Sequence, residues 1–392
     1  MFNQPGNLEP FFASQEARPE CVMDKAEIYQ QTLKHFLEPI WTLMEDDAVS
    51  EVLINGPKKI YVERGGKLTL SGREFKDNAA LMSAVRNIAE YVDRRVDIDN
   101  HSMDARLPDG SRVHVIIPPA ARGGAHVSIR RFKKSTFDMA SLVKWGSLTE
   151  MAAEFMELCI VLHKNTIISG GTGTGKTSML NALSTAIPEH ERIVVIEDSS
   201  ELQLNQPHTV YLEAQQAQPN GRGQVSIRDL FVDSLRMRPD RIVMGEIRRG
   251  EALDLIQSMI SGHAGSLTTV HANTPLDSLI RLETLCLMAG MEIPVYVVRR
   301  QIASAVHIVL QLARLDDGSR RVIAISEIMG MDEKQDYVVK PIFEFKSKGR
   351  DKEKRIIGQL EWTQKRPSFV SEIEEFGFQD RVKLTSALFQ SD

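Results

Sequence analysis

The sequence is 392 residues long, enough for two or three domains and a large buried core. A hydrophobic content of 42% and a charged content of 26% are ordinary for a globular protein, and the net charge of −5 argues against a general nucleic-acid-binding surface. Cys21, Cys159 and Cys286 lie too far apart for a disulfide framework or a metal site. No apolar stretch approaches the roughly 20 residues that cross a bilayer, and the N-terminus lacks the regions of a signal peptide. We therefore expect a cytoplasmic protein that reaches a membrane only through a partner.

The N-terminal region begins with a polar lead-in. Its first 20 residues hold Pro5, Pro10 and Pro19 among polar side chains, which is typical of a loosely ordered segment. From Met23 to about Trp41 the apolar residues recur at helical spacing, which predicts a helix. We assign residues 1–40 to this lead-in and helix.

The next region changes to the alternating pattern of strands, interrupted by turn residues and by one helical stretch. Three strands, a helix and two further strands are predicted at residues 51–54, 60–62, 68–70, 79–92, 112–117 and 125–129. These elements predict a small α/β domain over residues 41–132.

A polar linker is predicted at residues 133–140, and helices and strands then alternate over residues 141–392. Such alternation predicts a parallel β-sheet covered on both faces by helices. Late in this region the basic run at residues 346–355 lies between two apolar segments and is interpreted as an exposed loop. It is either a solvated hairpin tip or a contact for an acidic partner or anionic lipid.

Residues 170–177 fit the pattern G-x-x-x-x-G-K-T, with a strand predicted before them and a helix after them. Such a loop can wrap a triphosphate, because its backbone N–H groups point at the phosphates with no side chains in the way. Lys176 is expected to reach the β- and γ-phosphates, and the Thr177 hydroxyl is expected to hold Mg²⁺. The chain is predicted to bind ATP or GTP through Gly170, Gly171, Thr172, Gly173, Thr174, Gly175, Lys176, Thr177 and Ser178.

Two apolar runs end in carboxylates. Residues 192–196 lead into the adjacent acids Glu197 and Asp198, and residues 241–245 lead into Glu246. The carboxyl ends of strands form the ligand crevice of open α/β sheets, so both acids are expected near the nucleotide. The second run is a Walker-B-type strand, in which Glu246 would orient or polarise the attacking water. For Glu197, a solvated strand end remains the alternative.

A further strand is predicted at residues 266–270, with His263 before it and His271 after it. His271, at the carboxyl end of that strand, is expected to sense or contact the γ-phosphate. His263 is as readily a structural residue, and the spacing of the two histidines does not suit a metal site.

Arginines occur near the predicted site in three places. They follow Glu246, they close the first domain and they flank a tight turn within it: Arg248 and Arg249, Arg130 and Arg131, Arg106 and Arg112. Phosphoryl transfer spreads negative charge over the transferred group, so a guanidinium placed there accelerates hydrolysis. The alternative for each of them is a solvated surface arginine.

The order of these motifs resembles that of the type II/type IV secretion ATPases: P-loop, acidic box at residues 196–202, Walker-B-type strand and histidine box. The similarity runs from about residue 30 to the end, and residues 235–248 are similar to the branch shared by type IV secretion traffic ATPases and Flp/Tad pilus ATPases. Three features resemble the pilus side, the CpaF-like group: residues 104–112 with 116–119, residues 128–132, and residues 282–290 with 301–305. Arg249 and Ala264 depart from the expected pattern, in place of a glycine and an acid.

The resemblance implies a RecA-like P-loop NTPase domain preceded by a smaller N-terminal α/β domain, assembled as a homohexamer. ATP and Mg²⁺ would lie between the two domains, and arginines of the N-terminal domain or of a neighbour would complete the site. The protein would be peripheral at the inner face of the cytoplasmic membrane. There it would drive a platform protein that assembles or retracts a Flp/Tad-type (type IVc) pilus.

Other functions stay open. Within the same family, a type IV secretion traffic ATPase is the alternative, which neighbouring genes would decide. A nucleic-acid translocase would need a basic, aromatic-lined channel, which 6% aromatic content and net acidity do not favour, so direct nucleic-acid binding is not expected. A non-hydrolysing, nucleotide-gated scaffold would lack a catalytic acid, whereas Glu197 and Glu246 are both present.

Overall fold

The computed structural model describes residues 25–132, 138–217 and 221–389. The chain divides into two compact units, of which the first ends at Phe132 and the second begins at Lys133. The polar lead-in and residues 133–137 of the predicted linker lie outside the described residues, as does Cys21. Within the described part, none of the helices is both long enough and apolar enough to cross a membrane.

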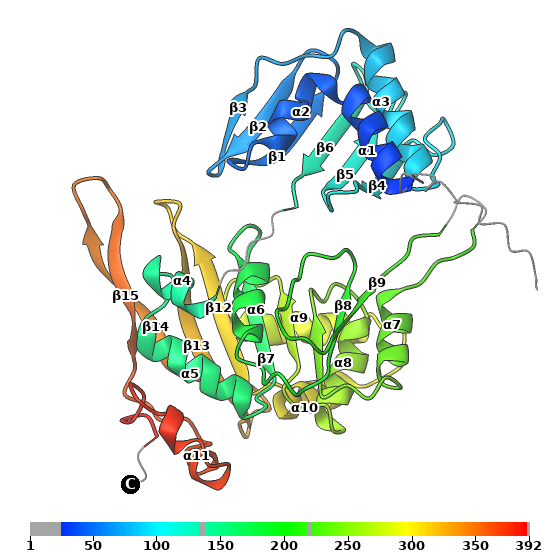
Figure 1. Ribbon diagram of the computed structural model, residues 1–392. Helices are drawn as coiled ribbons and strands as arrows, with labels where there is room; N and C mark the ends of the chain where they lie inside the picture. Colours follow the sequence, from blue (N-terminus) through cyan, green and yellow to red (C-terminus); the bar gives the residue numbers. More distant parts are fainter. Residues whose placement is uncertain (1–24, 133–137, 218–220, 390–392) are drawn as a thin grey trace, which may run out of the picture. The chain divides into compact units, whose positions relative to one another are not determined.

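The first unit is an antiparallel sheet with three helices (Figure 1). The sheet has the order β3-β2-β1-β6-β5-β4, and buried residues of its strands and of the three helices form one hydrophobic core. Its strands are β1 (Val49–Asn55), β2 (Ile60–Arg64), β3 (Lys67–Leu70), β4 (Ser102–Arg106), β5 (Arg112–Ile116) and β6 (His126–Arg130). Its helices are α1 (Lys25–Phe36), α2 (Glu38–Glu45) and α3 (Asn78–Tyr91).

Local sequence explains most of this unit. On β5, Val113 and Val115 are buried while His114 between them is exposed, as expected for a half-buried strand. Asp77 caps α3 by accepting a hydrogen bond from the backbone N–H of Ala80. Two features differ from the sequence prediction. The first helix is split into α1 and α2 at Leu37, and β4 was not predicted.

The second unit is built on a nine-stranded sheet with the order β15-β14-β13-β12-β7-β11-β10-β8-β9. From β12 to β9 neighbouring strands are parallel, whereas β12, β13, β14 and β15 pair antiparallel in sequence order. The strands are β7 (Thr166–Gly170), β8 (Ile193–Glu197), β9 (Thr209–Glu213), β10 (Arg241–Met244), β11 (Leu267–Val270), β12 (Ile308–Arg314), β13 (Arg320–Met331), β14 (Tyr337–Arg350) and β15 (Ile356–Trp362).

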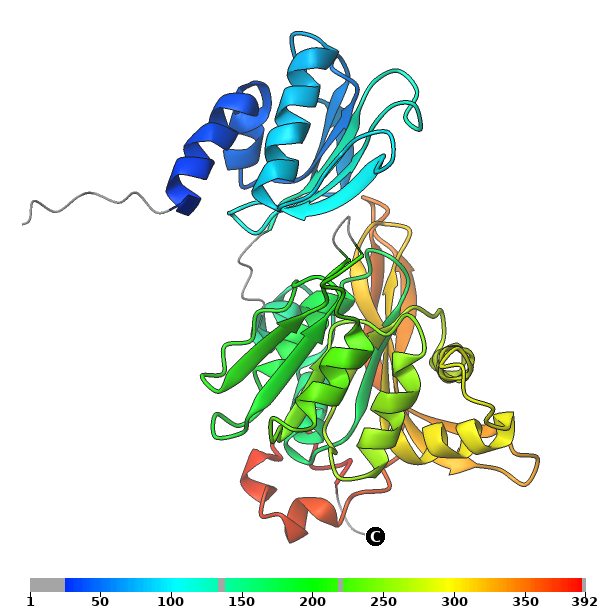
Figure 2. The same ribbon diagram turned by 90° about the vertical axis from the view of Figure 1, so that its right-hand side faces the viewer.

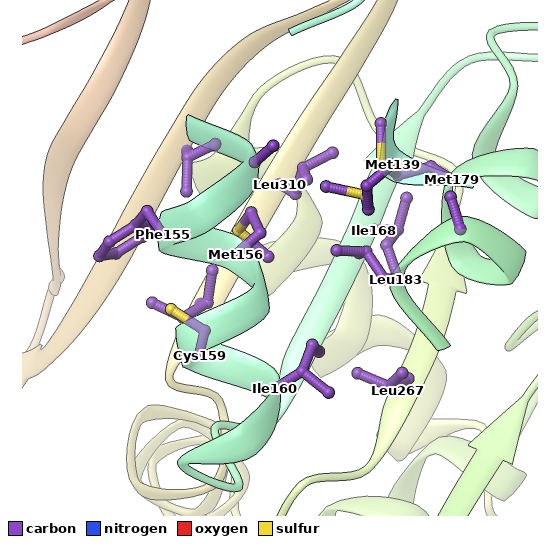
Figure 3. Packing of buried hydrophobic residues seen from close by; sticks show 14 of the residues in the cluster. Met139, Phe155, Met156, Cys159, Ile160, Ile168, Met179, Leu183, Leu267 and Leu310 are labelled. Carbon is purple, nitrogen blue, oxygen red and sulfur yellow. The ribbon is translucent and has the colours of Figure 1, made fainter. Parts of the chain in front are cut away.

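Helices cover both faces of the parallel part, and Figure 2 shows the same elements from the side. The helices are α4 (Met139–Lys144), α5 (Glu150–Val161), α6 (Lys176–Ser184), α7 (Ile227–Ser234), α8 (Glu251–Ile260), α9 (Pro275–Leu287), α10 (Val295–Ala305) and α11 (Glu372–Glu375), followed by a 3₁₀ turn (Gln379–Arg381). Successive residues of β7 enter different cores: Ile168 packs with α5 and α6, and Ile167 packs with α8, α9 and α10. Figure 3 shows the core formed with α5 and α6, to which the α5 side chains of Phe155, Met156 and Ile160 belong.

The α/β fold class predicted from the sequence is confirmed, with one difference. The alternation of helix and strand ends at β12, and the sheet continues as an antiparallel extension. The basic run at residues 346–355 is only partly a loop. Its first half belongs to β14 and its last residue precedes β15, within the long hairpin drawn in orange in Figure 1.

Candidate nucleotide-binding site

The P-loop connects the central strand β7 to the N-terminus of α6. Gly173 and Gly175 have φ angles of 71° and 96°, which side-chain-bearing residues rarely adopt. A Cβ on Gly170 would lie 2.5 Å from Thr174 Oγ1, so that position has no space for a side chain. Gly175 is the N-cap of α6 and supplies no side-chain cap to its first turn. The loop and the first N–H groups of α6, which include those of Thr177 and Ser178, therefore fit a bound phosphate chain.

Lys176 lies at the centre of this loop. Its ammonium group donates to the carbonyl oxygens of Gly170 and Gly171 at 2.9 and 3.0 Å, and only 8% of the residue is exposed. Burial lowers the pKa of Lys176, and the carboxylates of Glu246 and Glu201 oppose that shift. The ammonium group is therefore held in the P-loop, near two acids from the loops that follow β8 and β10.

Thr177 contacts a carboxylate that the sequence did not single out. Its hydroxyl donates to Glu201 Oε2 at 3.0 Å. A hydroxyl and a carboxylate side by side are hard oxygen ligands, the kind that Mg²⁺ takes together with phosphate oxygens. Among the described residues there is no group of three or more His, Cys, Asp or Glu side chains that could hold a metal. Thr177 and Glu201 are the residues that would contact a Mg²⁺ brought in with the nucleotide.

Glu197 lies at the end of β8, and its carboxylate is turned into the protein. Only 4% of the residue is exposed, and its Oε1 accepts hydrogen bonds from the backbone N–H groups of Glu201 and Leu202 at 2.8 and 3.0 Å. A Cβ on Gly245 would lie 3.0 Å from Glu197 Cγ, so β10 also packs against this side chain. The geometry gives Glu197 the part of a positioning residue, which shapes the loop that carries Glu201.

Glu246 follows β10 and connects the remaining polar residues of the site. Its two carboxylate oxygens lie 3.0 Å from His271 Nε2 and 3.1 Å from Arg248 Nη2. Arg248 also contacts Asp198 Oδ2 at 3.1 Å, and its pKa is raised by the hydrogen bond to Glu246. Thr269 of β11 supports this corner by donating to the Gly245 carbonyl at 2.7 Å.

His271 stands between the P-loop lysine and the Walker-B-type acid. Both of its ring nitrogens lie 3.4 Å from Lys176 Nζ. Burial and the neighbouring Lys176 cation lower the pKa of His271, while Glu246 opposes the shift. The lowered pKa favours the neutral ring, which can accept one hydrogen bond and donate another.

The structure thus brings Lys176, Thr177, Glu246, His271 and Arg248 together at the carboxyl edge of one sheet. Asp198, the second acid at the end of the β8 run, joins them, and so does Glu201, which the sequence prediction did not single out as a site residue. Both lie in the same acidic stretch as Glu197, so the signal was present but did not say which acid faces the P-loop.

The arginines predicted in the first unit have different environments. Cross-strand pairing joins Arg106 to Arg112 and Arg112 to Arg130, so these three form a row at one end of β4, β5 and β6. The Arg131 side chain is only 11% exposed, and its guanidinium donates to the backbone carbonyls of Asp46 and Val49. Arg131 is therefore occupied within its own unit, whereas the Arg130 side chain is exposed.

A P-loop between a buried strand and a helix, with an acid and a histidine at the ends of the neighbouring strands, defines a P-loop nucleoside triphosphatase. The profile of the family described as "Type II/IV secretion system protein" matches residues 34–383. The chain therefore belongs to this family, and it is an ATP hydrolase of the secretion ATPase type.

Individual relatives agree with this assignment. A putative conjugal transfer protein of Mycobacterium tuberculosis is 35% identical over 296 residues, covering 74% of this chain and 83% of the relative. The type IV secretion system protein VirB11 of Bartonella quintana is 30% identical over 319 residues, covering 71% and 88%. The crystal structure of the pilus retraction motor PilT with bound ADP is similar in fold, with a TM-score of 0.53, 17% identity and coverage of 89% and 87%. The predicted two-domain, RecA-like architecture is thus confirmed.

Proposed function

We propose that this chain is the ATPase motor of a type IV secretion machine of the conjugal-transfer class. Two kinds of support combine. The cluster of Lys176, Glu246 and His271 supports hydrolysis, and relatives named for conjugal transfer and type IV secretion, at 30–35% identity, support the biological role. The nucleotide supplies the phosphoanhydride bond, and the protein supplies binding, charge and orientation.

Each residue has a part in this proposal. The P-loop N–H groups and Lys176 bind the phosphates, and Thr177 with Glu201 holds Mg²⁺. Glu246 orients the attacking water, which its partially exposed carboxylate can reach. Neutral His271 donates to or accepts from the γ-phosphate region, and Arg248 offsets negative charge there.

In this proposal the first unit contributes arginines that act on the nucleotide. Its row of arginines, Arg106, Arg112 and Arg130, provides guanidinium groups of the kind that stabilise a transferring phosphoryl group. We propose that these arginines act on a nucleotide held by the second unit of the same chain or of a neighbour in a homohexamer. The ring would work at the inner face of the membrane through a platform protein.

Assembly of a Flp/Tad-type pilus is the second candidate. It is supported by the CpaF-like stretches noted in the sequence, of which residues 104–112 form the end of β4, the turn after it and the first residue of β5. Deleting the gene and complementing it distinguishes the two roles. Loss of DNA or protein transfer with normal pili supports secretion, and loss of pili with normal transfer supports the pilus role.

The chemistry is tested by two variants of the purified protein. Glu246→Gln should keep nucleotide affinity and lose turnover, because water activation needs the carboxylate whereas phosphate binding depends on the loop. Lys176→Ala should weaken ATP binding, since charge-assisted contacts contribute roughly 1.5–3 kcal/mol, or about ten- to a hundred-fold. Unchanged turnover in the first variant, or unchanged affinity for a fluorescent ATP analogue in the second, contradicts the proposal.

A further inference from the structure

Two arginines face each other where β12 ends and β13 begins. Arg314 and Arg320 are cross-strand partners, and so are Leu312 and Val322, two positions further into the sheet. Leu312 and Val322 are buried in the core formed with α5 and α6. Because side chains alternate along a strand, Arg314 and Arg320 lie on that same face, just beyond the core.

This place in the sheet adjoins the P-loop. β12 pairs with β7, and Leu312 is the partner of Gly170. The side chain of Arg320 reaches the loop itself, since a Cβ on Gly175 would lie 3.7 Å from Arg320 Cδ. Gly175 is the residue from which α6 and its first N–H groups begin.

The positive charge of this pair is not balanced locally. Both side chains are exposed, and within the described residues neither guanidinium makes a hydrogen bond or an ion pair. The nearby acids are engaged elsewhere: Asp316 pairs with Arg350 at 2.9 Å, and Asp317 accepts from the backbone N–H of Ile356 at 2.7 Å. Like charges directly opposite each other on paired strands are destabilising, so this arrangement calls for an anionic ligand.

The P-loop indicates which anion it is. The acid and the histidine that mark the γ-phosphate end, Glu246 and His271, follow β10 and β11 on one side of β7. β12 and β13 lie on the opposite side of β7. A nucleotide whose γ-phosphate faces Glu246 therefore directs its α-phosphate and ribose toward Arg314 and Arg320.

We propose that Arg314 and Arg320 are nucleotide-binding residues that hold the α-phosphate end of a nucleoside di- or triphosphate. The assignment rests on the nucleotide binding proposed above and adds two residues from the antiparallel extension. They belong to the same unit as the P-loop, so the contact requires no second subunit. They would bind substrate and product alike, because ATP and ADP share the α-phosphate.

The test compares three purified full-length variants by titration with fluorescent ATP and ADP analogues. The double variant Arg314→Gln/Arg320→Gln should bind both nucleotides about ten-fold more weakly, by the same factor for each. Arg314→Lys/Arg320→Lys should recover most of that loss because the charge is kept. The control, Lys352→Gln/Arg355→Gln, removes two charges from the neighbouring hairpin and should bind like the wild type.

Several results would overturn the assignment. Unchanged affinity in the glutamine variant excludes the contact, and a loss confined to ATP places the pair at the γ-phosphate instead. An equal loss in the Lys352→Gln/Arg355→Gln control indicates a general effect of charge. If Lys176→Ala also binds both nucleotides like the wild type, it is the nucleotide site itself that has been assigned wrongly.

Discussion

The two glutamates at strand ends are predicted to respond differently to the same substitution. Glu197 accepts two backbone hydrogen bonds in a nearly closed environment, whereas Glu246 contacts His271 and Arg248 at the site. Glutamine keeps an acceptor oxygen but removes the charge and the ability to act as a base. Glu197→Gln should therefore weaken the hydrogen bonds that order the loop carrying Glu201. Glu246→Gln should remove the carboxylate that we propose acts on the attacking water.

The expected magnitudes follow from these contacts. Charge-assisted hydrogen bonds are about twice as strong as neutral ones, so Glu197→Gln weakens two bonds by about 1–2 kcal/mol in total. That corresponds to a loss of about ten-fold in turnover if the ordered loop is required. Removing a general base costs about a hundred- to ten-thousand-fold, so Glu246→Gln should be the far more severe variant. Glu197→Ala, which keeps neither hydrogen bond, should have a lower turnover than Glu197→Gln.

The assay is steady-state phosphate release over a range of ATP concentrations, together with thermal unfolding of each variant. Glu197→Gln should alter KM as well as kcat, because the loop carries Glu201, the partner of Thr177. Glu246→Gln should lower kcat alone. Glu189→Gln removes one exposed carboxylate from the same unit and serves as the control. If Glu197→Gln abolishes turnover as fully as Glu246→Gln with unchanged melting, Glu197 is catalytic and the positioning role is refuted.

Three further outcomes are expected. Gly265 has φ +80°, and a Cβ there would lie 2.2 Å from Nη1 of the fully buried Arg241, so Gly265→Ala should lower the free energy of unfolding by about 2–4 kcal/mol in a urea titration. Burial lowers the pKa of His307 from 6.5 to about 4, so the unfolded chain takes up a proton at a higher pH than the folded protein does. The free energy of unfolding should therefore be unaffected by this histidine above about pH 6.5 and should fall by about 3 kcal/mol as the pH falls to 4. Unfolding at several pH values should show this slope, and His307→Gln should flatten it. Arg131→Gln should lower the melting temperature more than Arg130→Gln does, whereas Arg130→Gln should have the larger effect on turnover.

Matched variants make these outcomes decisive. Gly262 also has a positive φ but nothing within 4 Å of its Cβ position, so Gly262→Ala measures backbone strain without the clash. Equal losses for the two glycine variants would contradict the role given to Arg241. A pH slope unchanged by His307→Gln, or normal turnover in an intact Arg130→Gln protein, would refute the corresponding assignment.

The parts of the site that could be predicted are those specified by residues close together in the sequence. The P-loop pattern specifies a strand, glycines that permit positive φ, and a helix start, all within a few residues of Lys176. Glu246 and His271 were also predictable, because each lies within two residues of the carboxyl end of an apolar strand and parallel strands end at one edge. By contrast, β4 escaped prediction because Ser102–Arg106 carries too few apolar residues to show its alternation.

Other features depend on contacts between distant segments. Whether Glu197 or Glu201 faces Thr177 is decided by two backbone N–H groups that draw the Glu197 side chain inward. The spacing of the two acids along the sequence does not predict which of them contacts Thr177. Similarly, the role proposed for Arg314 and Arg320 depends on the pairing of β12 with β7 on one side and with β13 on the other. The antiparallel extension itself requires pairings that no local pattern reveals.

The central position of β7 has a mechanical consequence. This strand is bonded to β11 on one side and to β12 on the other, and its residues are buried in cores on both faces. Such a strand yields little when force acts on the loop that follows it, and its amide hydrogens should be among the last to exchange with solvent. We therefore expect any displacement produced at the nucleotide to be transmitted by the loops after β8, β10 and β11, while β7 stays in place.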